Sequence, residues 1–145
     1  MTKVTLTTVL PLPVERAREL ALRPATMRFV LAPVVGLAEE VDEPEVIEEG
    51  TEASARISLF GIPAWRHTIR VVRLAPDEIY TNERGGPVHT WNHRLTFAPL
   101  PGGRCKYTDE IEIEDGARGW PVRLFIELMF RHRHRRWQLL AAAAG

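Results

Sequence analysis

Residues 88–114 read VHTWNHRLTFAPLPGGRCKYTDEIEIE, and this stretch decides the fold. Polar and apolar side chains alternate along Val88–Ala98 and again along Arg104–Glu114, with Pro101-Gly102-Gly103 between the two runs. A period of two places alternate side chains on opposite faces of a strand, and Pro and Gly favour tight turns. The stretch therefore predicts two antiparallel strands joined by a short turn, each with one apolar face.

The strand pattern extends toward the N-terminus, where short β-rich runs are separated by Pro, Gly and acidic residues. The first residues, up to Val9, alternate and predict an initial strand that ends before Pro11. Helical spacing then predicts two short helices, at Val14–Leu22 and at about Pro24–Leu31. Four more strands are expected at approximately Val34–Val41, Thr51–Phe60, Ala64–Leu74 and Glu78–Arg84.

Helical spacing returns after Gly116 and predicts one long helix over Gly119–Ala143. Its broad apolar stripe consists of Val122, Phe125, Ile126, Met129, Phe130, Trp137 and Leu140. A curved antiparallel sheet needs its concave face covered, and this helix is the only predicted element long enough to cover it. We therefore predict an α+β fold in which seven strands curve around the C-terminal helix, with residues 1–145 forming one domain.

Composition narrows the function classes. The 145 residues carry 19 basic and 19 acidic side chains, so no overall field attracts nucleic acid or an anionic membrane. The longest nearly uncharged run, at residues 29–38, is too short to span a bilayer, and the first residues lack the order of a secretion signal. Cys105 is the single cysteine and is expected to be a small buried residue. We expect a cytoplasmic protein, either a monomer or a homodimer.

Several short motifs carry a family resemblance. They are Gly86-Pro87-Val88, Trp91-x-His93-x-Leu95-x-Phe97, Pro101-Gly102-Gly103, Thr108-Asp109-Glu110-Ile111 and Arg131-His132-Arg133. With the element order, they make the whole chain resemble the START-related SRPBCC superfamily of helix-grip proteins, which includes polyketide cyclases and lipid carriers. It looks like an uncharacterised branch whose members read Gly-Pro-Phe and Trp-x-His-x-His-x-Phe. Here Val88 replaces the aromatic residue and Leu95 replaces the second histidine, so a histidine-pair chemistry is not carried over. Function varies widely on one fold, so the resemblance implies a pocket and not a reaction.

Strand periodicity predicts which side chains face the interior. The inward set comprises His89, Trp91, His93, Leu95 and Phe97 on one strand, Cys105, Tyr107, Asp109, Ile111 and Ile113 on the next, and Trp65, His67, Ile69 and Val71 on an earlier one. Apolar walls with a few polar groups are typical of small-molecule pockets. We predict that the ligand-binding residues are Trp65, His67, Trp91, His93, Tyr107, Asp109, Met129, Phe130 and Arg133.

Each polar candidate also has a structural interpretation. His93 either contacts a ligand or hydrogen-bonds Asp109 or Tyr107 inside a filled core. Asp109 either acts as a buried acid or base, with His93 the other catalytic candidate, or is the partner of a histidine or arginine. Arg133 shares a helix face with Met129 and is therefore expected to point into the cavity. The other basic residues of the 131–136 run are expected on a solvated helix face or paired with the acidic strand positions Glu110, Glu112 and Glu114.

No cofactor or metal site is predicted. The five histidines form no compact ligand motif, and His132 and His134 diverge on a helix. The favoured function is therefore binding of a hydrophobic or aromatic molecule, such as a lipid, a quinone or a polyketide-like compound. A cyclase or dehydratase using His93, Asp109 and Arg133 is the first alternative. A protein- or RNA-interaction module that uses the basic helix is the second, although we expect no nucleic-acid partner.

Overall fold

The computed structural model describes residues 2–38, 44–86, 88–114 and 119–144. Along the chain, the elements are β1 (Thr2–Leu10), α1 (Val14–Ala21), α2 (Pro24–Leu31), β2 (Val35–Leu37), β3 (Glu52–Leu59), β4 (Ile62–Ala75), β5 (Glu78–Gly85), β6 (Val88–Leu100), β7 (Arg104–Ile113) and α3 (Gly119–Ala144). The predicted element order is confirmed. The strand predicted at Val34–Val41 is described only as the three residues of β2, and its end at residues 39–41 lies outside the described residues.

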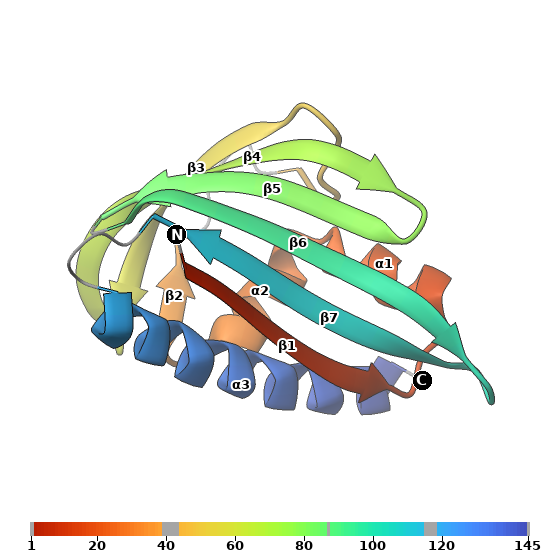
Figure 1. Ribbon diagram of the computed structural model, residues 1–145. Coiled ribbons are helices and arrows are strands. Elements are labelled where there is room, and N and C mark those ends of the chain that lie inside the picture. The colour runs from red at the N-terminus through yellow and green to blue at the C-terminus, as the bar shows by residue number, and fades with distance from the viewer. Residues whose placement is uncertain (1, 39–43, 87, 115–118, 145) are drawn as a thin grey trace.

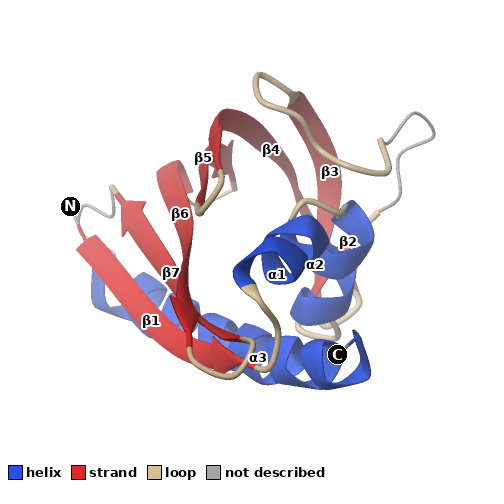
Figure 2. Ribbon diagram, turned by 90° about the vertical axis from the view of Figure 1, so that its right-hand side faces the viewer, coloured by secondary structure: helices blue, strands red, loops and turns tan. Residues whose placement is uncertain are grey.

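All seven strands form one antiparallel sheet in the order β1-β7-β6-β5-β4-β3-β2. Strands β2 to β7 follow one another as a meander, and β1 crosses to pair with β7 at the far edge. The sheet curls, and α3 lies along its concave side while α1 and α2 lie across the same side (Figures 1 and 2). This is the predicted α+β helix-grip arrangement, and its interior lies between the sheet and the three helices.

Helix α3 is held by the apolar stripe that the sequence predicts. Ile126, Phe130, Trp137 and Ala141 are buried on its inner side, and the Trp137 ring lies 5.3 Å from the Tyr107 ring of β7. Fully burying one large apolar side chain stabilises a fold by about 1.5–3 kcal/mol, so these few contacts are enough to fix the helix on the sheet.

Within the described residues, no helix combines the length and apolar character needed to cross a bilayer.

The strand parity that the sequence predicts survives along Trp65–Val71 because the irregularities of β4 lie at the ends of this run. Against β3, Ile57 pairs with Trp65 and Ser58 with Pro63, so the extra residue of β4 comes just before Trp65. In β4 the register shifts between Val71 and Arg73, downstream of Trp65 and His67. In β5 the shift follows Glu83. A bulge exchanges the two faces only beyond itself, so each strand keeps one inward face along the interior.

Candidate functional site

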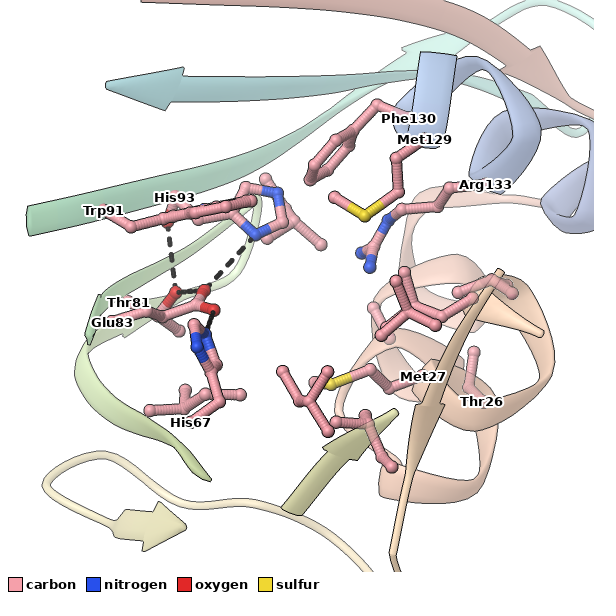
Figure 3. Close-up of a pocket in the computed structure, with 18 of the residues that line it drawn as sticks. Thr26, Met27, His67, Thr81, Glu83, Trp91, His93, Met129, Phe130 and Arg133 are labelled. Carbon is pink, nitrogen blue, oxygen red and sulfur yellow. Dashed lines mark hydrogen bonds and ion pairs between the residues drawn. The ribbon is translucent and has the colours of Figure 1, made fainter. Parts of the chain in front are cut away.

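The concave face of the sheet and the helices α2 and α3 enclose a cavity of about 110 Å³ (Figure 3). Its walls are largely apolar, with Met27 from α2, Leu95 from β6, and Met129 and Phe130 from α3. Its polar side chains include His67 of β4, Glu83 of β5, His93 of β6 and Arg133 of α3. The cavity therefore combines an apolar body with ionisable groups from four elements.

A second cavity, of about 450 Å³, adjoins the first on the side of β3 and β4. The two share five lining residues: Met27, Leu37, Ile47, His67 and Ile69. We refer to them as the inner and outer chambers. Because the same five residues line both, the two chambers lie next to each other.

The structure brings the predicted inward residues together. Seven of the nine predicted ligand-binding residues line the inner chamber: Trp65, His67, Trp91, His93, Met129, Phe130 and Arg133. Tyr107 and Asp109 lie behind the chamber wall and are both fully buried, so they reach the chamber only through their neighbours. The side chain of His89 lies outside the described residues.

Asp109 is the centre of a buried polar cluster. Its Oδ1 accepts hydrogen bonds from His93 Nε2 at 2.6 Å and from the Tyr107 hydroxyl at 2.8 Å. Its Oδ2 lies 2.8 Å from His134 Nε2 and 3.5 Å from Arg133 Nε. Burial alone would raise the pKa of this carboxyl. The charge of Arg133 and the bonds from His134 and His93 outweigh burial and hold the pKa well below its usual range. Asp109 is therefore a charged structural partner and not a protonated acid.

A second carboxylate, Glu83, is largely buried and occupies the opposite end of the cluster. It accepts hydrogen bonds from His67 Nε2 at 2.8 Å and from the Thr81 hydroxyl at 2.8 Å. His93 Nδ1 lies 3.6 Å from its second oxygen. Burial opposes the charged form, but the hydrogen bond from His67 and the nearby His93 imidazole hold the pKa of Glu83 well below its usual range. Glu83 is thus ionised, and its oxygens are already occupied.

His93 joins the two carboxylates. One ring nitrogen contacts Asp109 and the other faces Glu83, so the imidazole stands between two negative charges. Burial favours the neutral ring, but the hydrogen bond to Asp109 and the nearby carboxylate of Glu83 raise its pKa above the ordinary value. The side chains His134, Asp109, His93, Glu83 and His67 therefore form one continuous polar chain from α3 across the sheet to β4.

Arg133 is the cluster's permanent cation and is only 6% exposed. Its Nη2 donates to the Tyr107 hydroxyl at 3.1 Å, while its guanidinium points into the inner chamber (Figure 3). Burial opposes its charge, but Tyr107 and Asp109 outweigh burial and raise the pKa of Arg133 above its usual value. The prediction that Arg133 points into the cavity is confirmed.

Three members of the cluster were missed by the sequence interpretation. Thr81 and Glu83 share the inward face of β5 with Ile79, a period of two that the sequence contains. His134 follows Phe130 by four residues and so extends the buried stripe of α3. Because His134 stands in a run of charged residues, its helical spacing was not recognised as part of the buried stripe. The expectation that it lies on a solvated helix face or pairs with Glu110, Glu112 or Glu114 is wrong, since it is buried and hydrogen-bonds Asp109.

The rest of the basic run has other partners. His132 hydrogen-bonds the Ala32 carbonyl oxygen at 2.7 Å, and Arg136 donates to the Phe29 carbonyl at 3.0 Å. Of the three acidic residues considered as partners for this run, Glu110 pairs instead with Lys3 of β1 at 2.9 Å. The described His, Cys, Asp and Glu side chains form no group of three arranged to hold a metal ion.

One known protein family matches most of this chain. The family described as "Domain of unknown function (DUF8410)" matches residues 8–140. The chain belongs to the DUF8410 family. A search of curated proteins found no significant match to this DUF8410 sequence.

Solved structures place the DUF8410 chain in a fold class. Protein CV1439 from Chromobacterium violaceum superposes with a TM-score of 0.76 at 19% identity, covering 97% of this chain and 98% of the other. A START superfamily protein from Mycobacterium smegmatis superposes with a TM-score of 0.71 at 11% identity, covering 99% of both chains. A conserved protein from Geobacillus kaustophilus gives a TM-score of 0.69 at 16% identity, covering 99% of this chain and 97% of the other. The DUF8410 chain therefore has the SRPBCC/START-like fold that the sequence motifs predict.

Proposed function

We propose that this DUF8410 protein binds a hydrophobic or aromatic small molecule in the inner chamber. The observation that carries the proposal is a largely apolar cavity with ionisable groups placed on its wall. Apolar area supplies affinity, and a few fixed polar groups supply orientation. A chain selected only for stability gains little from such groups, because buried ion pairs roughly break even against apolar packing.

Chamber size limits the ligand. An apolar cavity of about 150 Å³ in another protein binds benzene, so the inner chamber, at about 110 Å³, suits no more than one ring or a short chain. A lipid, quinone or polyketide-like molecule would therefore place one end in the inner chamber and extend into the outer one.

The cyclase or dehydratase alternative requires a group that is free to move a proton. His93 lines the chamber, but both of its ring nitrogens face carboxylates. Asp109, the other candidate, is sealed behind the wall and holds its charge. These contacts favour binding over catalysis.

The RNA-interaction alternative also loses support, since Arg133 and His134 of the basic run are buried.

The proposal is tested with a pair of isoleucine variants on β4. Ile69 lines both chambers, whereas Ile62 is 70% exposed on the same strand. Ile69→Trp should take up space in the chambers that Ile69 lines and weaken binding of single-ring apolar probes by at least tenfold in an NMR titration, and Ile62→Trp should leave binding unchanged. Native mass spectrometry of freshly purified protein should show an apolar molecule that Ile69→Trp loses. Equal binding by both variants, or no probe binding by the wild type, would reject the proposal.

A further inference from the structure

Most of the polar groups of the inner chamber that retain hydrogen-bonding capacity are donors, although the hydroxyls of Thr26 and Thr81 can also accept. Among the described residues, the Glu83 carboxylate already receives His67 and Thr81 and faces His93. In contrast, buried nitrogens without a hydrogen-bond partner include the indole Nε1 of Trp65, Trp91 and Trp137, all of which line the chamber. An indole N–H can only donate. These three indole N–H groups therefore have no acceptor in the described structure.

Arg133 carries the largest unused donor capacity. A guanidinium has five N–H groups. In Arg133, Nη2 is bonded to Tyr107, and Nε makes only the 3.5 Å ion pair with Asp109. The remaining N–H groups belong to a side chain whose head points into the chamber (Figure 3). His67 Nδ1, also without a partner, lies against β5 instead, since a Cβ added at Gly85 would lie 3.0 Å from it.

The two carboxylates of the cluster already have close cationic or imidazole partners. The imidazole of His93 stands between the carboxylates of Asp109 and Glu83. The guanidinium of Arg133 forms an ion pair with Asp109. With that imidazole protonated, the formal charge of these four groups sums to zero. A ligand carboxylate would add an uncompensated negative charge to a buried site, which is costly, whereas a carbonyl adds an acceptor and no charge.

We infer that the inner chamber selects an apolar molecule bearing a neutral carbonyl group, whose oxygen accepts hydrogen bonds from Arg133. This inference rests on the proposed ligand-binding function and specifies its ligand class. An aryl ketone, a quinone or an ester fits the description, and a free carboxylic acid or a pure hydrocarbon fits it poorly. The ring or chain occupies the apolar wall around Met129 and Phe130.

Three probes of similar shape test the inference on the intact protein. Acetophenone has the carbonyl, α-methylstyrene replaces its oxygen with CH₂, and benzoate carries a negative charge. A hydrogen bond to a charged donor corresponds to roughly a tenfold to hundredfold gain in affinity, and we expect that advantage for acetophenone over α-methylstyrene in NMR titrations at neutral pH. Benzoate should bind more weakly than acetophenone.

The outcomes separate the two proposals. If acetophenone and α-methylstyrene bind equally, the carbonyl inference fails while the binding function stands. Stronger binding of benzoate than of acetophenone would also overturn the inference. If neither neutral probe binds, the binding function fails and the inference with it. Arg133→Met should abolish the preference for the ketone, and Arg131→Met, an exposed arginine on the same helix, should retain it. If Arg133→Met does not fold, the wild-type comparison of the three probes decides.

Discussion

Replacing Asp109 with asparagine should destabilise the protein strongly, although the side chain keeps its shape. The carboxylate receives donors on both oxygens, from His93 and Tyr107 on one side and from His134 on the other. An amide replaces one of these oxygens with an NH₂ donor, so either orientation of the new side chain places a donor against donors. The substitution also leaves Arg133 without its nearest carboxylate.

The magnitude follows from the burial of the pair. Removing one partner of a buried ion pair costs about 3–5 kcal/mol, because the remaining charge is left uncompensated. For a chain of this size, each kcal/mol lowers Tm by roughly 2–4 °C, so Tm should fall by about 8–16 °C if the loss is about 4 kcal/mol. Urea unfolding at neutral pH, followed by tryptophan fluorescence and circular dichroism, measures the free energy of unfolding directly.

The matched control is Glu110→Gln, at the next residue of β7. Glu110 forms an ion pair with Lys3 at 2.9 Å, and the two side chains are 25% and 56% exposed. Exposed pairs contribute about 0–1 kcal/mol, so this variant should unfold almost like the wild type. A loss below about 1 kcal/mol for Asp109→Asn would refute the view that its charge compensates Arg133 in the folded protein.

Two further predictions concern pH and backbone geometry. Asp109 and Glu83 have lower pKa values in the folded protein than in the unfolded chain, so their ionised forms stabilise the fold at any pH above the unfolded-state pKa. The free energy of unfolding should therefore fall as pH drops below about 4. The raised pKa of His93 stabilises the fold at low pH, so a second decline should occur as pH rises above about 6.5. Urea titrations from pH 3 to 9 should show that His93→Gln lacks the second decline, and its persistence would contradict the assignment. Gly86→Ala should cost more stability than Gly103→Ala. Both glycines have positive φ, so the backbone strain is similar, but an added Cβ would overlap the Trp65 ring at Gly86 and would meet nothing within 4 Å at Gly103. Equal losses in parallel urea titrations would mean that Trp65 moves freely.

The sequence predicts the walls of the chamber better than its ionic connections. Strand alternation identifies Trp91 and His93 as inward residues because both faces of a strand repeat every two positions. Helical spacing places Arg133 on the inner side of α3 for a similar reason. Local periodicity does not report which residues of distant strands meet. Glu83 and His67 are paired by the register of β4 and β5, and that register depends on turns and bulges.

The buried charges act by fixing positions more than by adding stability. A buried ion pair is a weak source of stability compared with apolar residues of the same volume. What the cluster supplies is a guanidinium held by Tyr107 and Asp109 before any ligand arrives. Immobilising a flexible side chain on binding costs about 0.5–1.5 kcal/mol, and an arginine that is already fixed avoids most of that cost. Tyr107 and Asp109, which lie behind the wall, therefore explain how the guanidinium of Arg133 can be aimed into a largely apolar chamber without a water-exposed partner.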